Sequence, residues 1–109
     1  MNAIQIIGDA NSVLAFALGG VPGHVVASAE EARAAVDDVV DAVRRAGGPV
    51  RSPTLLLVTS AMARQIRSHL DAVMLDASAP LILEFPGFGE AASETPVERL
   101  VNRVLGVPL

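Results

Sequence analysis

The sequence predicts an α/β fold in which four parallel strands form one sheet that is flanked by helices. Short apolar runs alternate with segments of helical periodicity four times along the 109 residues, and this alternation is typical of βα units. Residues 54–58 form an apolar run without polar alternation, as expected of a strand covered by helices on both faces, so we place it at the sheet centre. Right-handed crossovers and a short second strand favour the strand order 2-1-3-4.

The first strand and the first helix lie within residues 4–20. The isoleucines of residues 4–7 predict a buried strand, and a tight turn follows at Gly8, which lacks a Cβ and tolerates a positive φ. The helix is expected to begin near Ser12 and to end at the two glycines of residues 19–20. The side chains that can cap its first N–H groups are those of Asp9, Asn11 and Ser12.

A short strand and a long helix follow. Residues 24–27 predict a short strand, and short strands commonly lie at a sheet edge. Residues 28–31 form a Ser-x-x-Glu capping box, which predicts a helix from Ser28 to about Ala46. The glycines and prolines of residues 47–53 end this helix and form a loop. The apolar face of the helix consists of Ala32, Val36, Val39, Val40 and Val43.

Two further βα units complete the predicted fold. Thr59 or Ser60 is expected to cap a third helix, and residues 80–85 form the fourth strand. A second capping box at residues 95–98, with proline at the first helical position, predicts a last helix. The apolar face of the third helix consists of Met62, Ile66, Leu70, Val73 and Met74.

The composition excludes several classes of function. The net charge is −4, every basic residue is arginine, and aromatic residues make up 3%, so the basic and aromatic footprint of a nucleic-acid-binding protein is missing. Cysteine is absent, which excludes disulfides, thiolate metal sites and a cysteine nucleophile. No apolar run approaches the roughly 20 residues of a membrane span, and no signal peptide is predicted. The mean hydropathy of +0.49 predicts deeply buried strands or a surface that docks on a partner.

Ligands of an open α/β sheet bind at the carboxyl ends of its strands. A phosphoacceptor receiver domain of the same topology needs an acidic pair after strand one, an aspartate ending strand three, and a lysine further on. Here strand one offers Asp9 alone, strand three ends in Thr59 and Ser60, and no lysine occurs. A dinucleotide site needs a glycine-rich first turn, whereas this turn has only Gly8. We therefore expect neither phosphotransfer nor nucleotide binding.

No other constellation suggests chemistry, so we predict no catalytic residue, no cofactor and no metal. Ser60 suits a helix cap better than a nucleophile, and Asp9 suits a turn and a cap better than a metal site. His24 and His69 have no matched partner in the sequence. A buried Glu84 would need a partner; we expect it to be exposed at the strand end or hydrogen-bonded to the loop at residues 86–89.

Several segments together resemble one family. They are IGD followed by VLAFALGGV, then LLLVTSAMARQIRSHLD, APLILEFPG and PVERLVNRVLG. In this order and spacing they resemble the F subunit of the V/A-type rotary ATPases and ATP synthases over nearly the whole chain. The resemblance implies a non-catalytic central-stalk (rotor) subunit that helps to couple ATP hydrolysis or synthesis to proton or sodium transport. It implies a cytoplasmic position, peripheral to the membrane and without insertion into it. The implied partners are the coiled-coil D subunit, the catalytic A/B subunit ring and the membrane-rotor adaptor subunit.

The predicted elements divide the chain into an α/β, Rossmann-like domain at residues 1–85 and a loop plus C-terminal helix at residues 86–109. The resemblance makes the last helix the expected docking element for the coiled coil and makes the loop before it a hinge. A last helix that packs on its own sheet would carry the same amphipathic stripe, so the sequence leaves both arrangements open. The expected interface residues are Val97, Leu100, Val101, Val104 and Leu105, and the expected hinge residues are Pro86, Gly87 and Gly89.

Two rival classes share the predicted order of elements. A degenerate receiver-like domain would bind a signalling partner without phosphotransfer, and a small flavodoxin-like protein would bind a flavin or a nucleotide. The chain passes from the fourth strand to a single last helix and supplies no fifth strand, which favours the rotor subunit over the receiver-like domain. The proline-rich loop at residues 47–53, the loop at residues 86–94 and the absence of lysine depart from the family pattern, and they leave the contact residues open.

Overall fold

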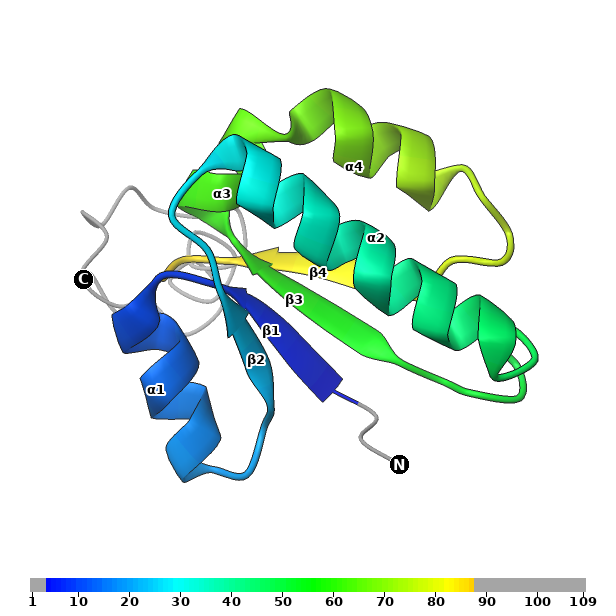
Figure 1. The fold of residues 1–109 in the computed structure, drawn as a ribbon, viewed down its shortest axis with the longest axis horizontal. Coiled ribbons are helices and arrows are strands. Elements are labelled where there is room, and N and C mark those ends of the chain that lie inside the picture. The colour runs from blue at the N-terminus through cyan, green and yellow to red at the C-terminus, as the bar shows by residue number, and fades with distance from the viewer. Residues whose placement is uncertain (1–3, 88–109) are drawn as a thin grey trace, which may run out of the picture.

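Four parallel strands form one sheet in the order β2-β1-β3-β4, as predicted. The computed structural model describes residues 4–87, and all statements about the structure concern this part of the chain. β1 pairs with both β2 and β3, and β3 pairs with β4 (Figure 1). The strands are β1 (Ile4–Gly8), β2 (Gly23–Val25), β3 (Leu55–Thr59) and β4 (Leu81–Phe85).

The helices are distributed unequally over the two faces of the sheet. One face is covered by α2 (Ala29–Arg45), α3 (Ser60–Gln65) and α4 (Arg67–Met74), whereas α1 (Ala10–Leu18) lies on the other (Figure 1). The main hydrophobic core lies between the sheet and the helices α2, α3 and α4. It includes every residue predicted for the apolar face of α2 except Val43, which is also buried but outside this cluster. Other members are Ile7, Leu56, Val58, Ile66, Leu70 and Ile82.

Local capping explains where α1 and α2 begin. Asp9 is the N-cap of α1, and its carboxylate accepts hydrogen bonds from the Ser12 backbone N–H (3.2 Å) and hydroxyl (2.7 Å). The helix therefore begins at Ala10, earlier than predicted. In the predicted capping box, Ser28 Oγ accepts from the Glu31 N–H at 3.1 Å. The Glu31 carboxylate reaches back to the N–H of Ala27 at 3.2 Å, so it satisfies the donor one residue before the cap.

The prediction of one continuous third helix is wrong. α3 and α4 are separated at Ile66, whose backbone has φ −120° and ψ 27°. Ile66 at this break and Leu70 on α4 are both buried, but Met74, expected on the apolar face, is 47% exposed. Thr59 occupies the predicted N-cap position, but its side chain makes no capping hydrogen bond.

Gly8 has a different role from the one predicted. Among the described residues, the glycines with positive φ are Gly20, Gly47 and Gly48, so Gly8 needs no left-handed conformation. A Cβ at Gly8 would instead lie 2.3 Å from Cγ2 of Thr59 on the neighbouring strand. Glycine is therefore required here by the close approach of β3.

The second face of the sheet is open over β3 and β4 within residues 4–87. In the registered pairs, Ile4 lies beside Leu55, which lies beside Leu81, and Leu57 lies beside Leu83. Ile4, Leu81 and Leu83 are 39%, 65% and 47% exposed, and Leu55 and Leu57 are partly exposed. β3 is thus interior in the sheet, as predicted. The described helices cover one of its faces, and cover of the other face stays a prediction, because the predicted last helix lies outside the described residues.

The predicted hinge and interface fall largely outside the described residues. Pro86 and Gly87 follow β4 without regular secondary structure. Gly89 and the stripe of Val97, Leu100, Val101, Val104 and Leu105 lie beyond residue 87, as does the capping box at residues 95–98. Both assignments, and the division at residue 85, therefore remain predictions.

Candidate interaction surface

The polar residues at the carboxyl ends of the strands serve structural roles. Asp9 caps α1 as predicted, and the Ser12 hydroxyl, more than the nearby backbone N–H groups, lowers the pKa of this carboxyl against the opposing effect of burial. Thr59 is buried against Gly8, and Ser60 is the first residue of α3. The carboxylate that a receiver-like chemistry would use is thus already engaged by its own helix.

Glu84 is exposed at the end of β4, as expected, but its partner is a helix rather than the loop that follows. Its carboxylate forms an ion pair with the Arg67 guanidinium at the start of α4. The hydrogen bond from Arg67 lowers the pKa of Glu84, and partial burial opposes this effect. The pair links the end of β4 to the helix that precedes it.

Both histidines have partners that sequence reasoning did not identify. His69 Nε2 on α4 lies 2.8 Å from Asp37 Oδ1 on α2, and His24 Nε2 on β2 lies 3.3 Å from Gln5 Oε1 on β1. Both contacts join neighbouring elements. Within residues 4–87, no group of three or more His, Cys, Asp or Glu side chains could hold a metal ion.

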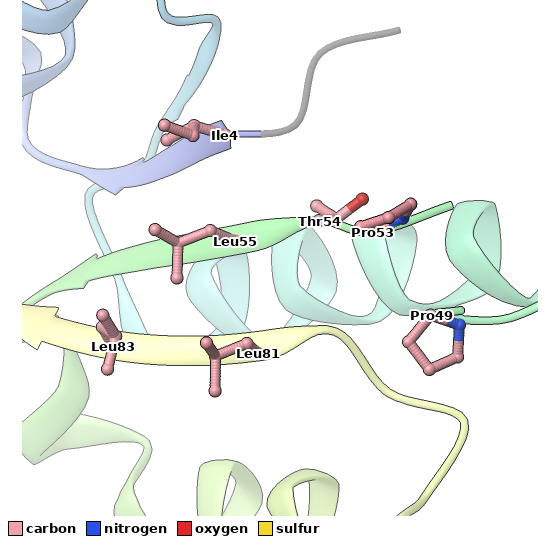
Figure 2. A pocket seen from close by; sticks show the side chains of 7 residues that line it. All are labelled: Ile4, Pro49, Pro53, Thr54, Leu55, Leu81 and Leu83. Atoms are coloured by element: carbon pink, nitrogen blue, oxygen red, sulfur yellow. The ribbon is translucent and has the colours of Figure 1, made fainter. Parts of the chain in front are cut away.

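The open half of the sheet forms an apolar groove. Figure 2 shows its side chains on the side of β1, β3 and β4 that faces away from α2. The groove lies near the amino ends of these strands, opposite the edge at which α/β sheets bind ligands. The residues that line it are Ile4, Pro49, Pro53, Thr54, Leu55, Leu81 and Leu83.

The polar groups at the rim of the groove are satisfied internally. The Thr54 hydroxyl donates to the Ser52 carbonyl at 3.2 Å, and the Thr54 carbonyl accepts from the Leu81 N–H at 3.2 Å. The groove therefore presents side chains without a polar group that a small polar ligand could recognise. Its chemistry favours an apolar segment of protein over a charged or polar molecule.

Charge is segregated between the two faces of the sheet. The exposed side of α2 carries most of the charged residues of the domain, whereas residues 10–29 contain no Asp, Glu, Lys or Arg. Leu14 and Leu18, one turn apart on α1, are exposed. Among residues 4–87, the face that carries α1 and the groove is therefore the more apolar one.

Sequence reasoning missed the groove because the strands gave no sign of it. An apolar residue on a strand is the same whether or not a helix covers it, and this holds for Leu55, Leu57, Leu81 and Leu83. In addition, an apolar run without polar alternation is typical of a strand that helices cover on both faces. The available signal was the high mean hydropathy, which predicted either deep burial or a docking surface. Within residues 4–87 these apolar side chains are partly exposed rather than deeply buried.

None of the helices in residues 4–87 is both long and apolar enough to cross a membrane. The longest of them, α2, carries charged residues along its exposed side.

Comparison with known proteins identifies the family. The family model described as ATP synthase (F/14-kDa) subunit matches residues 4–104. The chain is also similar to the F subunit of the A-type ATP synthase of Methanothermobacter thermautotrophicus, with 29% identity over 109 residues that cover 97% of this chain and 94% of the relative. The match extends from β1 through the segment that contains the predicted last helix. The chain belongs to the ATP synthase (F/14-kDa) subunit family, the F subunits of the A/V-type ATPases.

Proposed function

We propose that this protein is a non-catalytic central-stalk (rotor) subunit of a V/A-type ATPase or ATP synthase. The observation that carries the proposal is the family match across residues 4–104. The structural roles of Asp9, Thr59 and Glu84 support it, because the usual ligand edge of the sheet offers no free catalytic group among these residues. In this role the protein transmits torque and helps to couple ATP hydrolysis or synthesis to ion transport.

The proposed partners are the coiled-coil D subunit, the catalytic A/B ring and the membrane-rotor adaptor subunit. We place the protein in the cytoplasm, peripheral to the membrane, as part of the ATPase sector. The D subunit would bind the apolar stripe of the last helix, since an amphipathic helix can bury its apolar face against a pair of coiled helices. The loop that contains Pro86, Gly87 and Gly89 would set the direction of that helix.

The test is binding of the purified coiled-coil D subunit to the full-length chain. Leu100→Asp places a charge in the proposed seam, so we expect loss of the complex in size-exclusion chromatography while circular dichroism still reports a folded α/β domain. The matched control is Leu75→Asp, because Leu75 is 89% exposed at the end of α4. We expect the control to bind like the unchanged protein.

Two results would count against the proposal. Equal binding by the Leu100→Asp and Leu75→Asp variants would exclude the stripe as the seam. Failure of the unchanged chain to bind the D subunit, together with recovery of a signalling protein from native cells, would instead favour the receiver-like alternative. The proposed hinge has its own test: amide hydrogen exchange over residues 95–105 as slow as that of β3 would contradict it.

A further inference from the structure

We propose that α4 and the turn after it, residues 67–78, form a strap that opens as one unit while the remaining domain stays folded, and that opens more often at high salt. α4 lies beside α2 on the same face of the sheet (Figure 1). Polar contacts join the strap to α2 and β4 at its start, its middle and its end. The inference concerns the domain itself and does not depend on the proposed function.

Few apolar side chains anchor the strap to the core. Leu70 is the buried residue of α4, and Val73 packs against the core while it remains partly exposed. Met74 and Leu75, at the end of the helix, are 47% and 89% exposed. α2, by contrast, buries a stripe of alanines and valines along most of its length. Opening of the strap therefore exposes much less apolar surface than loss of α2 would, so it costs less free energy.

The chain can change direction at both ends of the strap. Ile66, directly before it, has φ −120° and ψ 27°, which interrupts the helix between α3 and α4. Residues 75–80, at the other end, contain neither helix nor strand. Isolated helices shorter than about 12 residues are marginal in water, and α4 has eight residues. Once its contacts are lost, α4 has little to keep it helical, so we expect its hydrogen bonds to open together.

The contacts at the start and the end of the strap are exposed ion pairs. Arg67 pairs with Glu84 of β4, and this pair offsets the unfavourable position of a cation at the positive end of the helix dipole. Asp76 pairs with Arg44 of α2. The side chains are 44% and 31% exposed in the first pair and 46% and 36% exposed in the second. Dissolved salt screens exposed charges, so both contacts weaken as the ionic strength rises.

The middle contact joins His69 of the strap to Asp37 of α2. His69 Nε2 lies 2.8 Å from Asp37 Oδ1, so the two groups form a hydrogen bond when Nε2 carries a proton and an ion pair when the whole ring is charged. The side chain of Asp38, the next residue of α2, makes no ion pair or hydrogen bond within residues 4–87. The two neighbouring aspartates therefore form a matched pair for a test.

Amide hydrogen exchange of the full-length chain, followed by NMR at one fixed pH, tests the proposal. After correction for intrinsic rates, the amides of residues 70–74 should exchange at similar rates, at least about tenfold faster than those of residues 39–43 in α2. Raising the NaCl concentration from about 0.1 M to about 1 M shortens the Debye length from about 10 Å to about 3 Å. This change should speed exchange in the strap at least about threefold, with a smaller effect in α2.

Two substitutions separate the contacts. Asp37→Ala removes the partner of His69, and Asp38→Ala makes the same change one residue further along α2. Asp37→Ala should speed exchange in the strap at least about threefold relative to Asp38→Ala, with equal exchange in β3. Glu84→Gln keeps an oxygen that can accept from Arg67 but removes the negative charge, so salt should speed exchange in the strap less in this variant than in the unchanged protein.

Three results would overturn the proposal. Strap amides that exchange as slowly as those of α2 would mean that the strap opens only when the whole domain unfolds. An equal effect of salt on the strap and on α2 would exclude ion pairs as what holds the strap in place. Equal strap exchange in Asp37→Ala and Asp38→Ala would exclude the contact of His69. The first two measurements use the unchanged protein, and none involves the D subunit, so their outcome is separate from that of the binding experiment.

Discussion

Gly8 of β1 and Thr59 of β3 approach so closely that a Cβ on Gly8 would lie 2.3 Å from Cγ2 of Thr59. Thr59 is 1% exposed, and its β-branched side chain has few alternative rotamers, so it cannot turn aside. The two residues therefore fix how closely the two central strands can approach at their carboxyl ends.

We predict that Gly8→Ala lowers the free energy of unfolding by about 1–3 kcal/mol, the usual effect of overpacking. Thr59→Ser removes the obstructing methyl group, so the Gly8→Ala/Thr59→Ser variant should lose less than the sum of the two single changes. Gly19→Ala is the matched control, because its nearest contact would be an ordinary 3.5 Å to the Phe16 carbonyl oxygen. Urea denaturation of the four variants measures these values. Strict additivity would contradict the proposed contact.

A pH-dependent contribution to stability is expected from Asp9. Its pKa is lowered from 3.8 in the folded chain, chiefly by the Ser12 hydroxyl. The folded state therefore binds this proton less readily than the unfolded state, so the stabilisation is complete above the unfolded pKa and is lost as the pH falls through the folded pKa. Asp9→Asn keeps a side-chain oxygen that can cap α1 but removes the ionisable carboxyl group. The difference in the free energy of unfolding between the unchanged protein and the Asp9→Asn variant should be constant near neutral pH and should shrink below pH 3.8. A difference that grows in acid would contradict this expectation.

The carboxyl group of Asp76 should titrate at unusually low pH. The Ser78 N–H (2.9 Å) and hydroxyl (2.7 Å) donate to it, and Arg44 of α2 adds a charged hydrogen bond. In this order of importance they lower the pKa of Asp76 to about 2. We expect Ser78→Ala and Arg44→Ala each to raise this pKa partway toward its usual value, because Ser78→Ala removes the hydroxyl but keeps the backbone N–H, and Arg44→Ala removes the charged hydrogen bond. Carboxyl-carbon NMR titration measures both changes. An unchanged pKa in either variant would contradict the corresponding contact.

Two leucines at α4 form a matched pair for testing the core. Leu70 is fully buried among α2, α3 and the sheet, whereas Leu75 ends α4 and is exposed. Leu70→Ala should lower the free energy of unfolding by about 2–5 kcal/mol, because it leaves a cavity. Leu75→Ala should change it by less than about 0.5 kcal/mol. Equal effects in thermal or urea unfolding would mean that α4 does not pack as described.

Much of the fold could be predicted, because helix caps depend on residues close in sequence and strand order depends on the right-handed βαβ crossover. Ser28 and Asp9 cap helices through hydrogen bonds to residues three positions away, so their roles are visible in the sequence. The strand order follows from right-handed crossovers and from a short second strand at an edge. These features require no knowledge of distant contacts.

The remaining features depend on contacts between distant residues. The apolar period of the third helical segment continues through Ile66, so nothing local marks the break between α3 and α4. The partners of Glu84 and His69 lie 17 and 32 residues away in sequence. Composition indicated an excess of apolar residues but could not locate the groove, because Leu81 and Leu83 would be the same residues beneath a helix.

The two edges of the sheet are unequal, and this has a consequence for self-assembly. β2 has three residues and offers little backbone for another strand to pair with, whereas β4 has five, and no strand within residues 4–87 pairs with its outer edge. Glu84 is the one charged residue of β4, and Arg67 neutralises it. Charges on an edge strand normally oppose addition of another strand. Strand pairing between two molecules would therefore use β4 of both copies, and it would stop at two molecules, because the short β2 strands would form both outer edges of the joined sheet.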